Sequence, residues 1–174
     1  GDIDYDRLNR LAVRAFHFGY PPLMRRMFDD GGEQLASMLG RVRGLGVTTS
    51  LDMARVDPAS PAGRVDWPAL LARVLPQVDL FLPSLDEMLF MFHPAMLAEI
   101  ESRPAGRGLA AEVGIERISD LAGRMLAMGA AVVAFKLGQD GLYLRTTPDA
   151  DRLKAAGRAF IDDSAPAGPL AGQP

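Results

Sequence analysis

The sequence predicts an α/β fold in which a mainly parallel sheet carries helices on both faces, and two observations lead to this prediction. Short, nearly continuous apolar runs recur along the chain, which is typical of strands buried on both faces of a parallel sheet. Between these runs, longer segments place apolar residues at every third or fourth position, the spacing of a helix face. This alternation along one chain favours layers of helix on sheet. The predicted strands are Val13–Phe18, Val47–Leu51, Val78–Leu82 and Val132–Lys136.

Length and composition fit one globular domain. The chain has 174 residues, 48% of them hydrophobic, and a formal net charge of −3. It has no block of Lys and Arg, no apolar run of about 18 residues and no cysteine, so we expect no nucleic-acid or membrane partner, no disulfide and a cytoplasmic location. We expect a core over residues 1–160 and a disordered Pro/Gly/Ala-rich tail over 161–174. The missing initial Met and opening strand at the start, and the Pro/Gly/Ala-rich tail at the end, lead us to expect a chain that is incomplete at both ends.

The helices are predicted from their apolar spacing and from residues that start or stop them. Asp4 or Asp6 caps the first helix, Pro22 suits the start of the second, and Asp66 caps the fourth. Gly129 ends the last one before the final parallel strand. The predicted helices are Asp4–Ala12, Leu23–Phe28, Glu33–Gly44, Trp67–Leu75, Leu85–Phe92, Met96–Ser102 and Ile115–Met128.

The remaining segments are predicted to be loops and a hairpin. Asp52–Val65 is rich in proline and long enough to be a functional loop. Gly138–Gly141 forms a tight turn after the last parallel strand, and Leu142–Leu144 returns as a second strand. His17 is interpreted as a hydrogen-bonded sheet residue and His93 as a helix end, so neither is assigned a catalytic role.

Ligands of open α/β sheets bind beyond the carboxyl ends of the strands. In this chain those positions are Gly19 and Tyr20, Asp52, Ser84 with Glu87, and the segment that begins at Lys136. Ser84 and Glu87 also have the spacing of a helix capping box, which alone explains both residues. Asp52 can equally cap a turn. The functional and the structural interpretations stay open from the sequence.

Several segments resemble, in chain order, those of PfkB (ribokinase-like) carbohydrate kinases. They are HFGYPPL from position 17, SLDMA from 50, DLFLPSLDEML from 79 and VVAFKLGQDGLYLRT from 132. The resemblance implies a ribokinase-like three-layer αβα fold. It also implies ATP-dependent phosphorylation of a hydroxyl on a sugar or sugar-like molecule, with ATP and Mg²⁺ as cofactors and a possible homodimer.

The resemblance assigns residues to the parts of such a site. Lys136, Gly138, Gly141 and Ser84 would bind the nucleotide. Glu87 would help to hold the metal ion, as the acidic member of an Asn-x-x-Glu-like motif. The substrate side would hold Gly19, Tyr20 and Asp52.

Two departures from the family bear on activity. Ser84 stands where the family has Asn, and a hydroxyl lacks the two-pronged hydrogen bonding of an amide. The family's Gly-Ala-Gly-Asp motif, which carries the catalytic base, has no counterpart in the segment from Asp162 to Gly168. No catalytic residue is therefore assigned. The alternatives are a non-catalytic pseudokinase or truncated remnant that binds nucleotide, sugar or a partner chain, and an unrelated α/β fold.

Overall fold

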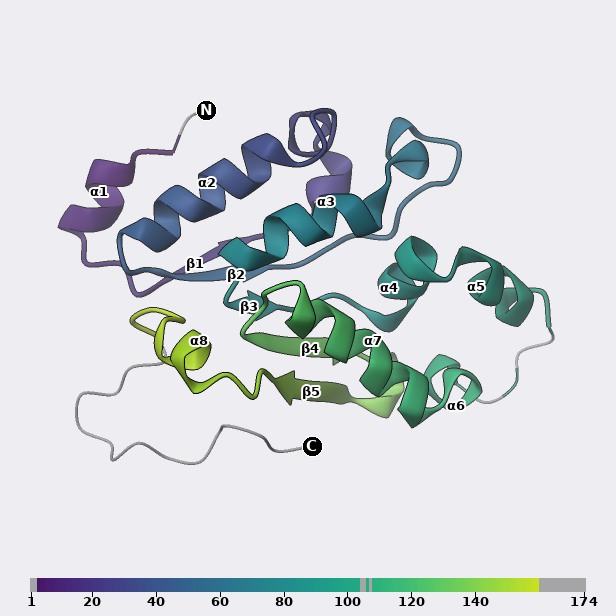
Figure 1. Cartoon of the computed structure of the whole chain (residues 1–174). Helices are drawn as coiled ribbons and strands as arrows, with labels where there is room; N and C mark the ends of the chain where they lie inside the picture. Colours follow the sequence, from purple (N-terminus) through teal and green to yellow (C-terminus); the bar gives the residue numbers. More distant parts are fainter. Residues whose placement is uncertain (1–2, 104–105, 107, 160–174) are drawn as a thin grey trace.

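The computed structural model describes residues 3–103, 106 and 108–159. At its centre is a five-stranded sheet whose strands follow one another in chain order (Figure 1). The first four are parallel, and the fifth is antiparallel to the fourth. The strands are β1 (Ala15–Phe18), β2 (Thr48–Leu51), β3 (Leu80–Phe81), β4 (Val132–Lys136) and β5 (Leu142–Thr146). The predicted α/β class with a mainly parallel sheet is confirmed, and so is the hairpin at its end.

The four predicted parallel strands are all present, but three are shorter than expected. Val13 and Val47 lie just outside β1 and β2. Strand β3 has only two residues, because a 3-10 turn that ends at Gln77 precedes it closely and Pro83, which has no N–H to donate, follows it. Apolar runs therefore located the strands correctly and overestimated their length.

The helices are placed mostly as predicted. The α-helices are α1 (Tyr5–Arg10), α2 (Glu33–Gly44), α3 (Trp67–Val74), α4 (Leu85–Phe92), α5 (Pro94–Glu101), α6 (Leu109–Val113), α7 (Ile115–Ala127) and α8 (Ala150–Lys154). The 3-10 turns are η1 (Pro21–Leu23), η2 (Arg25–Met27), η3 (Pro61–Arg64), η4 (Leu75–Gln77) and η5 (Gly138–Asp140). Among the described residues, no helix has the length and apolar content needed to cross a membrane.

One predicted helix is absent, and two short helices were not predicted. The segment Leu23–Phe28 is not one helix but parts of η1 and η2, because Met24 between them has an extended backbone with φ −121° and ψ 101°. The short helices α6 and α8 were not expected. Helix α8 does carry a local start signal, since the Asp149 carboxylate accepts hydrogen bonds from the backbone N–H groups of Asp151 and Arg152.

The predicted caps are confirmed where the structure describes them. The Asp4 carboxylate accepts a hydrogen bond from the Arg7 N–H at 2.8 Å, and Asp66 accepts one from Ala69 at 3.0 Å. Ser84 and Glu87 form a capping box at the start of α4. These contacts join residues three positions apart, which is why the sequence alone predicts them.

The two faces of the sheet are covered unequally. Leu51, Phe81, Val133 and Phe135 share one face by strand register, and all belong to the main core, with α2 against β2 and α7 against β4 and β5. On the opposite face, Leu153, which belongs to α8, packs with Leu80 and Val132 in a small second apolar cluster. At the β5 edge of that face, Leu142 and Leu144 are 57% and 52% exposed. Helices are thus present on both faces as predicted, but the described helices pack mainly on one side, with α8 on the other.

A buried carboxylate ties the amino ends of the strands together. Asp79 is fully buried, and its side chain accepts hydrogen bonds from Arg152 at 2.8 Å, Arg43 at 3.3 Å and the Thr49 N–H at 2.9 Å. Arg152 comes from α8 and Arg43 from α2. The Asp79 cluster therefore fastens helices from both sides of the sheet at the edge opposite the expected ligand site.

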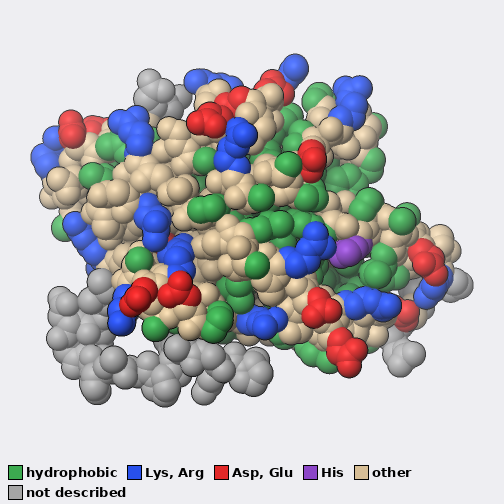
Figure 2. Space-filling model, viewed as in Figure 1, with side chains coloured by type: hydrophobic (Ala, Val, Ile, Leu, Met, Phe, Trp, Pro, Cys, Tyr) green, Lys and Arg blue, Asp and Glu red, His purple; other side chains and the backbone are tan. Residues whose placement is uncertain are grey.

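The surface in view is mixed in charge. In Figure 2, Lys and Arg side chains are interspersed with Asp and Glu, and apolar side chains gather between α3 and α7. The predicted limits of the core, 1–160, and of the tail, 161–174, stay predictions, because residues 160–174 lie outside the described part.

Candidate functional site

The carboxyl ends of the parallel strands bring four of the predicted residues to one edge of the sheet, here called the carboxyl edge. Lys136 ends β4, Asp52 follows β2 directly, and Ser84 and Glu87 lie at the start of α4 after β3. The Lys136 N–H donates to the carbonyl of Pro83 at 2.9 Å, and a parallel bridge pairs Ser84 with Lys136. Separate parts of the chain meet here because neighbouring parallel strands end at the same edge.

Asp52 and Lys136 form an ion pair across the end of β3. The Lys136 Nζ lies 2.6 Å from Asp52 Oδ1 and 2.7 Å from Oδ2, so both carboxylate oxygens contact the same ammonium group. The lysine side chain is 43% exposed and that of Asp52 only 14%. The pair therefore places a partly accessible cation at the carboxyl edge.

Glu87 is the least accessible charged group of this edge, with 8% of its surface exposed. One of its oxygens accepts the Ser84 N–H at 2.7 Å. Burial raises the pKa of Glu87 above its ordinary value, although the hydrogen bonds from Ser84 and the charge of Lys136 act in the opposite direction. The charge of Asp52 raises the pKa further. Glu87, Asp52 and Lys136 are thus electrostatically coupled.

Backbone hydrogen bonds place Gly19 and Tyr20 beside Asp52. The Asp52 N–H donates to Phe18 at 3.0 Å, and the Tyr20 N–H donates to the Asp52 carbonyl at 3.3 Å. Tyr20 has a left-handed backbone with φ 63° and is 53% exposed. A left-handed tyrosine is uncommon, so the chain turns sharply here.

Upstream of this turn, the predicted role of His17 is confirmed. Its Nδ1 lies 3.1 Å from the Ser50 hydroxyl, which makes it a hydrogen-bonded sheet residue.

The glycines of the predicted turn are required by its backbone. Gly138 has φ 63° and Gly141 φ 89°, values that other residues adopt at a cost. A Cβ atom added at either position would meet no atom within 4 Å, so space around the turn is open. The turn begins two residues after Lys136, and its accessible backbone is the kind of surface that approaches phosphate closely.

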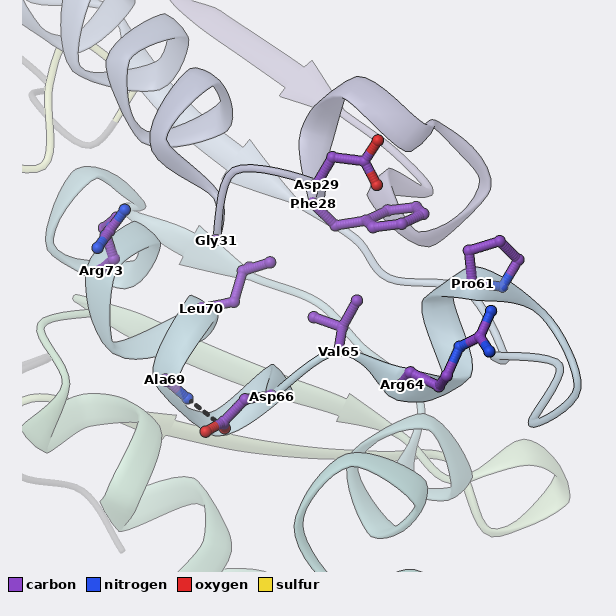
Figure 3. A pocket seen from close by; sticks show the side chains of 10 residues that line it. All are labelled: Phe28, Asp29, Gly31, Pro61, Arg64, Val65, Asp66, Ala69, Leu70 and Arg73. Atoms are coloured by element: carbon purple, nitrogen blue, oxygen red, sulfur yellow. Dashed lines mark hydrogen bonds between the residues drawn. The ribbon is translucent and has the colours of Figure 1, made fainter.

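Two cavities are lined by residues of the loops that follow β1 and β2, and one of them also by residues of α3. One of about 350 Å³ is shown in Figure 3, where Phe28 and Leu70 line it together with the charged side chains of Arg64 and Arg73. A second, of about 340 Å³, shares Phe28 and is also lined by Arg55. None of these residues was singled out individually from the sequence, although Arg55 and Arg64 belong to the Asp52–Val65 loop that was predicted to be functional.

Arg55 shows why these loop residues were missed. It lies 3.6 Å from Asp86 in α4 and 2.5 Å from Glu101 in α5, so the Asp52–Val65 loop is anchored to both helices. The hydrogen bond and charge of Glu101 raise the pKa of Arg55. Local sequence offers no signal for contacts made over such separations.

The residues present suit a divalent ion that is held mainly by a ligand. Within the described ranges, no group of three or more His, Cys, Asp or Glu side chains is placed to hold a metal. Mg²⁺ is commonly bound through one or two carboxylates, several waters and substrate phosphates. Glu87 fits that pattern as a single carboxylate, whereas both oxygens of Asp52 contact Lys136.

Comparison with known proteins supports the fold. No protein-family model and no curated protein matches the sequence. Among solved structures, the crystal structure of a PfkB protein from Polaromonas sp. JS666 is 20% identical, with a TM-score of 0.51 over 82% of this chain and 40% of that chain. A second, described as the crystal structure of Sa239, is 21% identical over 64% of this chain and 28% of that chain, with a TM-score of 0.40.

The first match shows that this chain has a ribokinase-like, PfkB-type α/β fold. The matched part of this chain covers less than half of the length of that PfkB protein. At this level of identity the likeness concerns the fold, and activity has to be argued from the site itself.

Proposed function

We propose that this protein belongs to the PfkB carbohydrate kinases and acts in ATP-dependent phosphorylation of a hydroxyl on a sugar or sugar-like molecule. The observation that carries the proposal is the grouping of Lys136, Asp52, Glu87 and Ser84 at the carboxyl edge of a PfkB-like sheet. Phosphoryl transfer depends mainly on positioning and charge neutralisation, and this edge offers groups for both.

Each group has a distinct role in the proposal. Lys136 contacts a nucleotide phosphate, and the backbone of Gly138 and Gly141 approaches the phosphates closely. Ser84 contributes a hydroxyl. Glu87 orients Mg²⁺ or its waters, and the ion supplies positive charge to the phosphates when bound.

The substrate side of the proposed site comprises Gly19, Tyr20 and Asp52. The two cavities next to Phe28 lie in the loops beyond these residues and leave room for a small polar molecule. We assign no catalytic base, because the chain has no Gly-Ala-Gly-Asp motif and Asp162–Gly168 lies outside the described residues.

The second candidate function is binding without catalysis. It is favoured by Ser84 in place of the family's Asn. In that case the same edge binds a nucleotide, while turnover falls by the roughly 10²–10⁴-fold that a positioned base contributes, and by more where oriented backbone donors are also lost.

The test combines nucleotide binding with turnover. ATP binding is measured by calorimetry with Mg²⁺ for the wild type, Lys136→Met and the control Lys154→Met, which alters an exposed lysine of α8. We expect Lys136→Met to lose at least about tenfold in affinity, and Lys154→Met to retain it. Equal affinity in all three proteins would contradict the proposed site.

Turnover then separates the two functions. ADP release is followed with a panel of hexoses, pentoses, sugar acids and nucleosides. Sugar-dependent release near 1 s⁻¹, the low end of common enzyme rates, identifies a kinase. Binding that depends on Lys136 without such release identifies the non-catalytic alternative.

A further inference from the structure

The cation that the proposed function assigns to phosphate is already paired with a carboxylate. Both oxygens of Asp52 contact the Lys136 ammonium, at 2.6 and 2.7 Å. A phosphate that binds Lys136 therefore has to share the ammonium with Asp52 or displace it. Coulombic repulsion between Asp52 and the incoming phosphate opposes that binding.

We propose that Asp52 competes with phosphate for Lys136 and thereby makes phosphate binding at the carboxyl edge depend on a divalent cation. The inference rests on the proposed function, because it assumes that phosphates bind at Lys136. It adds a statement about specificity: the site binds the metal complex of a polyphosphate more tightly than the metal-free polyphosphate.

The geometry allows Lys136 to change partners. Its side chain is 43% exposed and flexible, so water can solvate the ammonium as it moves. Asp52 is 14% exposed, and its Oδ1 also accepts the Met53 N–H at 2.8 Å. The carboxylate thus keeps a hydrogen bond after the lysine leaves. Lysine is the mobile member of the pair and Asp52 is the fixed one.

The local charge explains the need for a cation. Lys136 is paired with Asp52, and its charge also lowers the pKa of Glu87, whereas the charge of Asp52 raises that pKa. With both carboxylates ionised, the three groups carry a net charge of about −1. A bare polyphosphate adds further negative charge to this set, whereas its complex with Mg²⁺ brings compensating positive charge. Mg²⁺ therefore reduces the repulsion that Asp52 imposes.

The experiment uses inorganic tripolyphosphate, which has the phosphates of ATP and no base or ribose. Its binding to the full chain is measured by calorimetry, with and without Mg²⁺, for the wild type, Asp52→Asn, Lys136→Met and the double variant. Asp86→Asn is the matched control, because Asp86 is acidic and close in sequence but pairs with Arg55 instead. Circular dichroism confirms that each variant is folded.

Without Mg²⁺ we expect Asp52→Asn to bind tripolyphosphate about tenfold more tightly than the wild type, since one repelling charge is removed near the ligand. With Mg²⁺ the two proteins should differ by less than about threefold. Asp86→Asn should behave as the wild type, and the double variant should bind as weakly as Lys136→Met.

The outcomes separate this inference from the proposed function. If Asp52→Asn binds no more tightly than the wild type without Mg²⁺, while Lys136→Met still loses binding, competition by Asp52 is wrong and the phosphate site stands. If Lys136→Met binds as the wild type does, both ideas fail. Absence of binding in every protein also overturns both.

Discussion

Glu87 combines a capping role with an unfavourable electrostatic environment. Burial raises its pKa, so the folded chain holds the Glu87 proton to a higher pH than the unfolded chain does. Between the ordinary pKa of a glutamate and the raised one, the folded state binds more protons. The contribution of Glu87 to the free energy of unfolding therefore falls as the pH rises through that window.

We accordingly predict that in Glu87→Gln the free energy of unfolding falls less, or rises more, with increasing pH than it does in the wild type. Glutamine retains a hydrogen-bond acceptor for the Ser84 N–H but has no proton to lose in this range. Urea unfolding from about pH 4 to about pH 7 measures the slope for both proteins. Asp86→Asn is the control. An unchanged slope in Glu87→Gln would show that Glu87 titrates normally in the fold.

Asp79 is the fully buried carboxylate at the opposite edge, and we predict that Asp79→Asn is strongly destabilising. It would leave Arg152, whose side chain is only 15% exposed, without its anionic partner. Breaking a buried ion pair by removing one member costs about 3–5 kcal/mol. Urea denaturation of Asp79→Asn, Arg152→Met and the double variant measures the coupling. Additive effects would contradict a direct pair, and Asp151→Asn on the surface should change stability little.

Asp66 and Asp79 show which side-chain contacts a sequence predicts and which it does not. The cap at Asp66 was predicted because its partner, Ala69, lies three residues away. Arg152 pairs with Asp79, which lies 73 residues away in the chain, and no local sequence pattern predicts this ion pair. Burial of a charged side chain is decided by the whole fold.

The element boundaries depend on a few glycines with special backbones. Gly129 separates α7 from β4 with φ 115°, and an added Cβ would lie 2.8 Å from the Cα of Pro76. Both the conformation and the contact with rigid backbone exclude a side chain. The sequence predicted this stop from the glycine alone, while its close approach to η4 became visible only in the structure.

Gly129→Ala is therefore expected to lower the free energy of unfolding by about 2 kcal/mol or more. Gly44→Ala is the contrasting change, since Gly44 ends α2 and an added Cβ would meet nothing within 4 Å. There we expect a gain of up to about 1 kcal/mol. Thermal and urea unfolding measure both. Equal effects of the two substitutions would contradict the close approach of Gly129 to Pro76.

The order of the elements was more predictable than their lengths. Continuous apolar runs and capping residues are local signals, and they located β1 to β4 and α2, α3, α4 and α7. The predicted helix at Leu23–Phe28 failed because two prolines precede Met24 and its extended backbone splits the segment into single turns. Helix α8 was overlooked although Asp149 marks its start.

Across the whole molecule, the less covered face of the sheet is the main candidate for self-association. Leu142 and Leu144 are exposed on β5, which lies at the edge of the sheet formed by the described residues. An edge strand with exposed apolar side chains offers both backbone hydrogen bonds and apolar surface to a second chain. This supports the expected homodimer as a proposal.

Leu144→Lys should shift the chain toward the monomer at a given concentration, with a change in stability within about 0.5 kcal/mol. Leu11→Lys is the control, because Leu11 is 64% exposed but lies next to α1, away from β5. Sedimentation velocity measures the association of each protein. If Leu144→Lys associates as the wild type does, this edge is not the contact surface.

The site itself was predictable in location and not in its contacts. Parallel strands of consecutive order bring Asp52, Ser84, Glu87 and Lys136 to one edge, and the sequence predicted that edge. The pairing of Lys136 with Asp52 joins residues 84 positions apart and depends on how a flexible side chain lies across β3. The cavities near Phe28 and Arg73 depend on loop packing and left no recognisable pattern in the sequence.

The central claim, that nucleotide phosphates bind at the carboxyl edge, is tested most directly by following backbone amide signals in NMR spectra as ATP and Mg²⁺ are added. We predict that the signals of Met53, Ser84, Gly138 and Gly141 shift together with one dissociation constant, while that of Thr49 beside Asp79 stays in place. Lys136→Met should remove these shifts. Shifts confined to the cavity around Leu70 and Arg73, or no shift at all, would contradict the assignment of the nucleotide site.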